Sequence, residues 1–416
     1  MASLKEIGEP PISLEMPMFV DHRLAHRKAY IINLLARMCA ELDITESRLQ
    51  QAKERYEGVA RWLAAGDHFL LHDLSIYLQG STALGTSVRP VGKNEHDVDL
   101  VAFLPEGSTA QTPAYIKKVI GDRLKAHATY ARLLEEKIRC WRLVYTNEFH
   151  LDITPAILNL ACRNQGELVP DKSLREWKGS NPRGYREAFE ARAALVPLIK
   201  VTKAFDESIQ SRADIEPFPI TSNGRSILCR IVQVAKRHRD VHFEGQDLAL
   251  WPISVILTTL IAWSYERCVK AGVYETEFDL MIAVLRGMPD FIRRTLPDGS
   301  PGWHIPNETT IDENFAERWN DDPDKAGAFF TWHAKAVADM ENLSRVDGAD
   351  QVRKGMDESF GPRPVGAAFT ALDNEIANVR RSGLLKVAPL VGLTAAPSVA
   401  AAVPVRSNTF FGRDCG

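Results

Sequence analysis

Apolar residues near the start of the chain recur at steps of three and four positions, which is the period of one face of an α-helix. The stretch 20–40 follows this pattern, and a second stretch follows it up to about Gly66. The apolar positions of the second stretch are Leu49, Ala52, Tyr56, Val59 and Leu63. The pattern predicts two helices, and we expect the second to lie as a long spine behind a β-sheet.

Apolar and polar residues alternate in four later segments, and this alternation predicts β-strands. The segments are 75–79, 97–104, 139–145 and 149–153, and a helix that opens at Pro113 is predicted to run to about 128. In the last segment the apolar side chains share one face, whereas His150 and Asp152 share the opposite one. Pro155 has no N–H for a ladder bond, so we expect pairing to stop soon after Asp152.

From about residue 185 the helical period dominates. The expected helices span 185–209, 224–239, 252–270, 276–287, 325–346 and 365–381, with a long ordered loop at 288–324. After Leu385 the composition changes to Ala, Val, Pro and Ser, and residues 394–416 are typical of a flexible tail. We predict an α+β protein with a mixed-sheet lobe and its spine helices (1–190), a helical lobe (191–385) and a flexible C-terminal tail (386–416).

Two aspartates separated by one residue, Asp97 and Asp99, lie on the same face of a predicted strand. Such a pair alone is more often an exposed strand or turn, but here Gly80-Ser81 precedes it and Asp152 lies on another predicted strand. Neighbouring carboxylates repel each other unless cations lie between them. Two-metal phosphoryl transfer needs carboxylates that hold two cations about 3.5–4 Å apart. We therefore predict that Asp97, Asp99 and Asp152 are catalytic ligands of two Mg²⁺ ions, with Mn²⁺ as the alternative ion.

Three further kinds of residue bear on this site. Gly80 allows the backbone to approach a phosphate closely, and the hydroxyl and amide of Ser81 can donate to it. His150 lies beside the third aspartate, and we expect a hydrogen-bonded wall residue because metal activation needs no histidine. Lys200 and Lys203 lie three positions apart on a predicted helix and either serve phosphates or are ordinary lysines.

Composition narrows the classes of function. The net charge of −3 over 416 residues argues weakly against a broad surface for nucleic acid, so any basic contact must be local. There is no run of about 18 apolar residues, and no membrane span is expected. The six cysteines lack Cys-x-x-Cys spacing, which indicates reduced thiols in a cytoplasmic protein.

The Gly-Ser pair, the Asp-x-Asp pair and the distal aspartate resemble the site of polymerase-beta-like nucleotidyltransferases. Further segments resemble the bacterial cGAS/DncV-like enzymes of this class, and the likeness covers roughly residues 25–385. These segments are Ser180-Asn181-Pro182-Arg183-Gly184-Tyr185, Ile231 to Asp240 followed by Pro252-Ile253-Ser254, and Asn314-Phe315-Ala316-Glu317-Arg318-Trp319. The resemblance implies a catalytic lobe and a helical lobe. It also implies synthesis of a cyclic di- or trinucleotide messenger from ATP and other nucleoside triphosphates in CBASS antiphage defence.

The resemblance also implies roles for Lys236 and Ser254, which match residues that contact the donor triphosphate. From the residues alone, the run Lys236-Arg237-His238-Arg239 is either a phosphate-binding cluster or a solvated helix end. Two other functions fit the same fold. One is nucleotidyl transfer to RNA or protein, and the other is a non-enzymatic binding module, against which the three intact aspartates argue.

The end of the sequence, with Phe410, Phe411 and Gly416, is unusual for a solvated tail because exposed apolar residues invite binding. In the family that the chain resembles, a ubiquitin-activating-and-conjugating-like partner attaches some members to targets through their C-terminal residue. A terminal glycine has no side chain and can enter a narrow active-site channel. The hypothesis is that Gly416 is a conjugation site, and the alternative is an inert tail.

Overall fold

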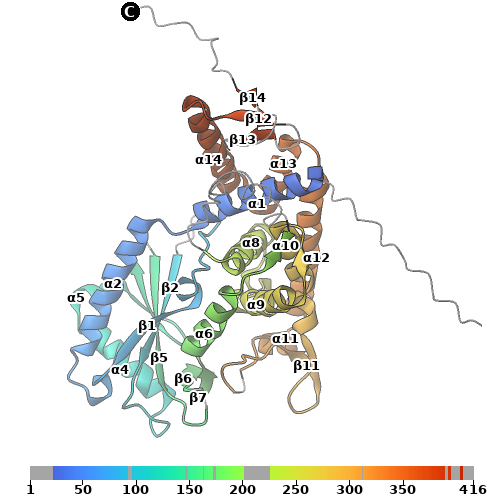
Figure 1. Cartoon of the computed structure of the whole chain (residues 1–416). Helices are drawn as coiled ribbons and strands as arrows, with labels where there is room; N and C mark the ends of the chain where they lie inside the picture. The colour runs from blue at the N-terminus through green and yellow to red at the C-terminus, as the bar shows by residue number, and fades with distance from the viewer. Residues whose placement is uncertain are drawn as a thin grey trace, which may run out of the picture.

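The computed structural model describes residues 22–91, 96–145, 149–162, 164–171, 175–200, 225–311, 313–388, 392–394 and 403–405. They form a mixed β-sheet covered by helices and, beside it, a lobe built mainly of helices (Figure 1). This is the α+β architecture that the sequence predicted.

The sheet of the first lobe contains seven strands within the described residues, in the order β1-β2-β5-β4-β3, with β6 pairing β5 and β7 pairing β6. They are β1 Ser75–Gln79, β2 His96–Phe103, β3 Leu134–Glu136, β4 Trp141–Tyr145, β5 Phe149–Leu158, β6 Glu167–Asp171 and β7 Glu176–Ser180. Strands β2 and β5 are parallel, and the other pairs are antiparallel. Helices α2 (Glu46–Ala64) and α4 (Pro113–Lys125) share one hydrophobic core with the sheet, and α5 (Ala128–Leu133) packs against it. Helix α2 is thus the predicted spine.

The expectation that pairing stops at Pro155 is wrong. Strand β5 continues to Leu158, and Pro155 lies inside its parallel ladder with β2. The carbonyl oxygen of Ala156 accepts a hydrogen bond from the backbone N of Leu104 at 2.8 Å, so the nitrogen of Pro155 faces the other side of the strand. On that side β4 has ended its pairing at Ile153, and the missing N–H breaks no ladder bond.

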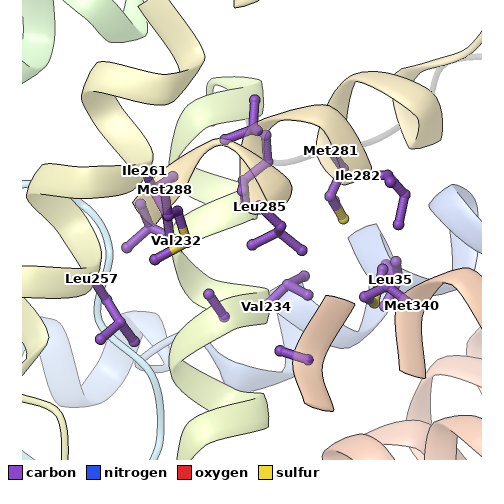
Figure 2. Close-up of a cluster of buried hydrophobic side chains, with 14 of the residues drawn as sticks. Leu35, Val232, Val234, Leu257, Ile261, Met281, Ile282, Leu285, Met288 and Met340 are labelled. Atoms are coloured by element: carbon purple, nitrogen blue, oxygen red, sulfur yellow. The ribbon is translucent and has the colours of Figure 1, made fainter. Parts of the chain in front are cut away.

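The second lobe is built from helices whose buried side chains form one core. These helices are α1 His22–Leu42, α6 Pro182–Ala193, α8 Ile227–His242, α9 Ser254–Ala271, α10 Glu277–Arg286, α12 Pro323–Arg345, α13 Ala349–Phe360 and α14 Pro362–Arg381. Figure 2 shows part of this core, in which side chains from several of these helices meet. Helix α13, 12 residues between Gly348 and Gly361, was not among the expected helices, and it buries Val352, Met356 and Phe360.

Helix α1 belongs to the core of this second lobe, although the sequence analysis placed it with residues 1–190. Its apolar face, which includes Leu34 and Leu35, is buried with side chains of the other helices. The Nζ of Lys28 lies 2.5 Å from Oδ1 of Asp279 on α10. Apolar period shows which face of a helix is buried, but it does not show against which lobe that face packs.

Helix α9 and the turn before it, Leu248–Ala271, would be long and apolar enough to cross a membrane by length and composition. The core helix of a globular protein passes the same test, and 56% of the qualifying window is buried inside this protein. Leu257 and Ile261 of α9 lie in the cluster of Figure 2. Helix α9 is therefore a packing element in the core of the second lobe.

Smaller elements correct the remaining boundaries. The segment 288–324 is not one loop, because it contains the hairpin of β10 (Arg293–Thr295) and β11 (Pro301–His304) and the helix α11 (Glu317–Asp321). The helix expected at 185–209 ends at Ala193, and β8 (Leu198–Ile199) follows and pairs with β9 (Val273–Tyr274). The last part of the expected helix, 201–209, lies outside the described residues. The 3₁₀ turns among the described residues are η1 Phe69–Leu71, η3 Leu248–Leu250 and η4 Met288–Phe291.

Part of the predicted tail is ordered. Strand β12 (Lys386–Ala388) pairs with β13 (Gly392–Thr394) and β14 (Val403–Pro404), so flexibility is the wrong expectation for these three short strands. Residues 406–416, and with them Gly416, lie outside the described residues. Five cysteines fall within the described chain and all are free thiols there.

Candidate active site

The three aspartates come together on the polar face of two neighbouring parallel strands. Asp99 of β2 lies directly opposite Asp152 of β5, and Asp97 lies opposite His150. The residues that alternate with them, among them Val98, are buried in the core beneath the sheet. A slip of one residue would turn the apolar set toward solvent, so the core fixes this register. The structure therefore brings together the three carboxylates that the sequence singled out.

Asp99 is the aspartate that lies against the Gly-Ser segment. Burial, together with the negative charges of Asp152 and Asp97, raises the pKa of the Asp99 carboxyl to about 7. Gly80 opens the short helix α3 (Gly80–Ala83) with a φ of 65°, and a Cβ at this position would lie 2.6 Å from Oδ2 of Asp99. Both the positive φ and the close approach require glycine here.

Arg142 is a site residue that sequence reasoning missed. Its Nε donates to Oδ1 of Asp152 and its Nη2 donates to Oδ2, each at 2.7 Å. The same Nη2 lies 3.4 Å from Oδ1 of Asp97. The signal for Arg142 was present in the alternation of 139–145, because Arg142 lies between the buried Trp141 and Leu143 and so faces the aspartates.

His150 is placed as expected. Its Nδ1 lies 3.1 Å from Oδ1 of Asp97, and its side chain is only 21% exposed. This contact makes His150 a hydrogen-bonded neighbour of the carboxylates.

The aspartates fit a divalent metal in residue type and in register, because carboxylate oxygens are the ligands that Mg²⁺ prefers. Their oxygens do not yet converge, since nowhere in the described chain do three acidic, histidine or cysteine side chains gather closely enough to hold one ion. Arg142 takes up both oxygens of Asp152. The three aspartates are therefore candidate metal ligands by residue type and register, and the described side chains do not form a closed metal site.

A cavity of about 520 Å³ lies between the two lobes next to these strands. From the first lobe it is lined by Gly80, Ser81 and Asp99, and from the second lobe by Lys236 and Ser254. These five residues come from segments far apart in the sequence. All four predicted nucleotide-binding residues therefore share one cavity with a predicted metal ligand.

Lys236 is buried at the wall of this cavity. Its Nζ donates to the carbonyl oxygen of Thr86 at 3.2 Å and to Oγ1 of the same residue at 3.1 Å. Burial, with a smaller contribution from the positive charge of Arg239, lowers the pKa of Lys236 to about 7. Because Lys236 is only 4% exposed, the alternative of a solvated helix end is wrong for this residue.

The arginines that follow Lys236 in the basic run bond to other parts of the protein. The Nε of Arg237 donates to the carbonyl oxygen of Phe360 at 2.7 Å, which ties α8 to α13. Arg239 donates through Nη1 to Oγ of Ser254 at 3.0 Å and so orients that cavity residue. Elsewhere, Lys200 pairs with Glu275 at 2.6 Å, and Lys203 lies outside the described residues.

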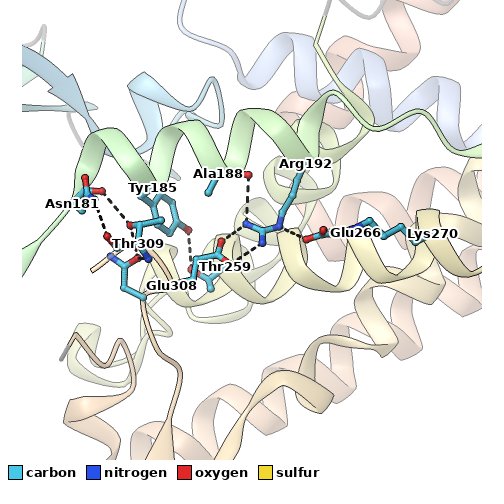
Figure 3. A network of polar contacts seen from close by, with 10 residues as sticks. Asn181, Tyr185, Ala188, Arg192, Thr259, Glu266, Lys270, Glu308 and Thr309 are labelled. Atoms are coloured by element: carbon cyan, nitrogen blue, oxygen red, sulfur yellow. Dashed lines mark hydrogen bonds and ion pairs between the residues drawn. The ribbon is translucent and has the colours of Figure 1, made fainter. Parts of the chain in front are cut away.

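One wall of the cavity is a loop that polar contacts hold against the helices (Figure 3). Asn181, which caps α6, donates from Nδ2 to the carbonyl oxygen of Thr309 at 2.8 Å. On the same helix, the Nε of Arg192 lies 2.6 Å from Oε2 of Glu266, and its Nη2 lies 2.8 Å from Oε2 of Glu308. The segments that carried the family resemblance thus include residues that fix the cavity wall.

Comparisons with known proteins agree with this geometry. Residues 31–192 match the Second Messenger Oligonucleotide or Dinucleotide Synthetase domain. A c-di-GMP synthase of Roseivirga ehrenbergii is 28% identical over 389 residues, which cover 93% of this chain and 99% of that protein. Cyclic dinucleotide synthase CdnG of Bradyrhizobium diazoefficiens is 23% identical over 411 residues, which cover 91% of this chain and 94% of that protein. The structure of a CD-NTase, CdnG of the same bacterium in complex with GTP, aligns with a TM-score of 0.62 at 19% identity over 83% of this chain and 99% of that one, so the two folds agree.

Proposed function

We propose that the chain is a cGAS/DncV-like nucleotidyltransferase that joins nucleoside triphosphates into a cyclic dinucleotide that contains guanine. The observation that carries this proposal is the cavity shared by Gly80, Ser81 and Asp99 of one lobe with Lys236 and Ser254 of the other. The printed names of the relatives, a c-di-GMP synthase and a cyclic dinucleotide synthase, support the choice of product, and GTP bound to CdnG supports the choice of base.

In this proposal the triphosphate lies between the lobes. The backbone at Gly80 approaches the phosphates closely, and Ser81 donates its hydroxyl and amide. Lys236 leaves Thr86 and turns its ammonium toward the phosphate oxygens, which are stronger acceptors than a carbonyl oxygen. Ser254, held by Arg239, donates from the helical lobe.

Asp97, Asp99 and Asp152 are the proposed ligands of two Mg²⁺ ions, for which Mn²⁺ can substitute. When bound, such ions lower the pKa of an attacking hydroxyl and neutralise charge on the triphosphate. The three carboxylates lie on adjacent positions of one sheet face, which is the placement that this role requires.

The proposed reaction forms two phosphodiester bonds. A ribose hydroxyl oxygen of one nucleotide bonds to the α-phosphorus of a second, the bond from that phosphorus to the bridging oxygen breaks, and pyrophosphate leaves with the electron pair. The hydroxyl proton passes to solvent. A second round between the remaining hydroxyl and triphosphate closes the ring.

The test is an incubation of the purified protein with each labelled nucleoside triphosphate and Mg²⁺ or Mn²⁺. We expect a phosphatase-resistant product from GTP that disappears in the variant Asp97→Ala/Asp99→Ala. Asp122→Ala is the matched control, because Asp122 is exposed on α4 and pairs only with Lys118 among its described contacts. Label in added RNA or in protein would support the alternative, nucleotidyl transfer to a macromolecule, and no turnover would contradict both.

We further propose that the product acts in antiphage defence in the cytoplasm, and that a ubiquitin-activating-and-conjugating-like partner attaches Gly416 to targets. Cells that carry the protein should survive phage infection better than cells that carry Asp97→Ala/Asp99→Ala. Deletion of Gly416 should remove covalent conjugates of the protein in cells while the purified variant still makes its nucleotide product. Conjugates that persist after this deletion would leave the tail without this role.

A further inference from the structure

Arg142 occupies the space between two of the proposed metal ligands. Its guanidinium contacts both oxygens of Asp152 at 2.7 Å, and its Nη2 reaches to 3.4 Å from Oδ1 of Asp97. An ion bound to both Asp97 and Asp152 would have to lie where this nitrogen lies. We propose that Arg142 competes with the divalent cation for Asp152, and that metal binding moves the guanidinium away from the site. This inference rests on the proposed metal site.

The backbone cannot relieve the competition. Arg142 lies directly opposite Asp152 in the antiparallel pairing of β4 with β5. Its chain neighbours Trp141 and Leu143 are buried in the core of the first lobe, so strand β4 is fixed in place. Arg142 can therefore yield only by rotating its side chain, and the long arginine side chain has several rotamers for that movement.

A second acceptor lies on the opposite side of Arg142. In the pairing of β3 with β4, Glu135 is the cross-strand partner of Arg142. Cross-strand partners project from the same face of a sheet, so Arg142 stands between the carboxylate of Asp152 and that of Glu135. Glu135 is exposed and pairs with Lys137 at 2.7 Å, a surface contact that is weak enough to be exchanged. The geometry thus offers Arg142 a resting place on Glu135 when a cation holds Asp152.

Electrostatics favours the contact of Arg142 with Asp152 when no cation is bound and the contact with Glu135 when a cation is bound. Without a cation, Asp97, Asp99 and Asp152 gather on one sheet face and the guanidinium of Arg142 contacts two of them, Asp97 and Asp152. With a divalent ion present, the guanidinium would be a like charge inside the ligand set and would be repelled toward Glu135. Arg142 in this view neutralises the carboxylates when no cation is bound to them and raises the metal concentration that loads the site.

The test measures Mn²⁺ binding to the metal-free full chain, without nucleotide, from the electron paramagnetic resonance signal of free Mn²⁺. Competition predicts that Arg142→Met binds Mn²⁺ roughly tenfold more tightly than the wild type, the factor expected for loss of one charge-assisted contact. Arg142→Lys keeps the charge but loses the two-pronged contact, so it should also bind more tightly than the wild type. If the Met variant binds more tightly while the Lys variant equals the wild type, simple charge repulsion explains the result and the competition is overturned.

A variant of Glu135 tests the exchange independently of how well the Arg142 variants fold. Glu135→Gln removes the alternative acceptor on an exposed edge strand and should weaken Mn²⁺ binding about threefold. Glu54→Gln, an exposed glutamate on α2 that is bonded to Gln50, is the control and should bind as the wild type does. Unchanged binding in Glu135→Gln would overturn the exchange between the two carboxylates.

The outcomes separate this inference from the proposed metal site. If the wild type does not bind Mn²⁺, or binds it equally well after Asp97→Ala/Asp99→Ala, the metal site itself is wrong and the competition falls with it. If the wild type binds, the double variant does not, and neither Arg142 variant binds more tightly than the wild type, only the competition is wrong.

Discussion

Lys236 carries a titratable amine that is buried where the two lobes meet, and it has Thr86 as its hydrogen-bonding partner in the described structure. A buried ammonium without a carboxylate against it is unfavourable, which is why the pKa of Lys236 falls to about 7. Such a group suits a site that receives an anionic ligand, because the ligand supplies the missing charge. The same burial has consequences for stability and for nucleotide affinity.

The first prediction concerns stability and pH. The pKa of Lys236 is about 7 in the folded chain and 10.5 when unperturbed. Between these values the unfolded state holds a proton that the folded state lacks, so this group makes the free energy of unfolding rise with pH; below pH 7 the full penalty of burial is present. Relative to Lys236→Met, the wild type should gain about 2 kcal/mol between pH 7 and pH 9, measured by urea unfolding. Parallel pH profiles of the two proteins would show that Lys236 does not titrate in this range.

The second prediction concerns the ligand. Lys236→Met should lower the affinity for GTP at least about tenfold, because a charge-assisted contact to a phosphate is lost. Mn²⁺ binding at the aspartates should persist, since Lys236 bonds to Thr86 and to none of the three carboxylates among its described hydrogen bonds. Calorimetric titration of each variant with GTP and with Mn²⁺ separates the two effects. Equal loss of both ligands would indicate a folding defect.

At the scale of elements, the sequence predicted the strands and the faces on which their side chains lie better than it predicted which strands pair. Alternation placed Asp97, Asp99 and Asp152 on polar faces, and the parallel pairing of β2 with β5 then made neighbours of them. Alternation places Arg142 on the polar face of β4, and the three residues between β4 and β5 predict a hairpin, but the two signals were not combined and the contact of Arg142 with Asp152 was missed. Strand pairing is a long-range property, whereas face periodicity is local.

The expected end of strand β5 near Pro155 shows the same limit of sequence-based prediction. Local chemistry predicted that β5 would stop near Pro155, but the outcome depended on where the neighbouring strand β4 ended. Gly80 shows the opposite case, because its positive φ and its close approach to Asp99 are demands of one residue, whereas its predicted approach to a phosphate stays a prediction. The sequence thus predicts what one residue needs and fails where two elements must be placed together.

The third prediction tests the contacts that tie α6 to the cavity wall. Arg192 is 15% exposed and bonds Glu266 and Glu308 on two different elements. Arg192→Ala should lower the free energy of unfolding by about 1–2 kcal/mol, because the contacts of the partly buried guanidinium to Glu266 and Glu308 are lost, although Glu266 keeps its ion pair with Lys270. It should also raise the GTP concentration for half-maximal synthesis, since the loop that carries Glu308 loosens.

The control for that prediction is Arg286→Ala. Arg286 makes two contacts to Glu341 at 3.0 and 2.7 Å but is 59% exposed. Exposed pairs of this kind contribute about 0–1 kcal/mol, so this variant should remain close to the wild type in urea unfolding and in synthesis. Similar losses in both variants would mean that the network around Arg192 has no special role.

At the scale of the whole molecule, the two lobes have separate hydrophobic cores. Helix α1 belongs to the core of the second lobe, although it precedes all elements of the first lobe in the sequence. Helix α1 packs among the later helices, then α2 crosses to the back of the sheet (Figure 1). The helical lobe is therefore assembled from both ends of the described chain. A change in α1 should act on the lobe that supplies Lys236 and Ser254, although α1 is followed directly in sequence by the elements of the other lobe.

The last prediction follows from this arrangement. Leu35 on α1 is 1% exposed within the core of the helical lobe, and Leu49 on α2 is 48% exposed. Leu35→Ala should lower the free energy of unfolding by about 2–4 kcal/mol because it leaves a cavity in a packed core. Leu49→Ala makes the same change in a helix at the surface and should cost less than about 0.5 kcal/mol. Urea unfolding of both variants tests this prediction, and equal losses of the free energy of unfolding would place α1 outside the core. A large loss for Leu35→Ala, together with reduced GTP affinity, would show that helix α1 supports the helical-lobe wall of the nucleotide cavity.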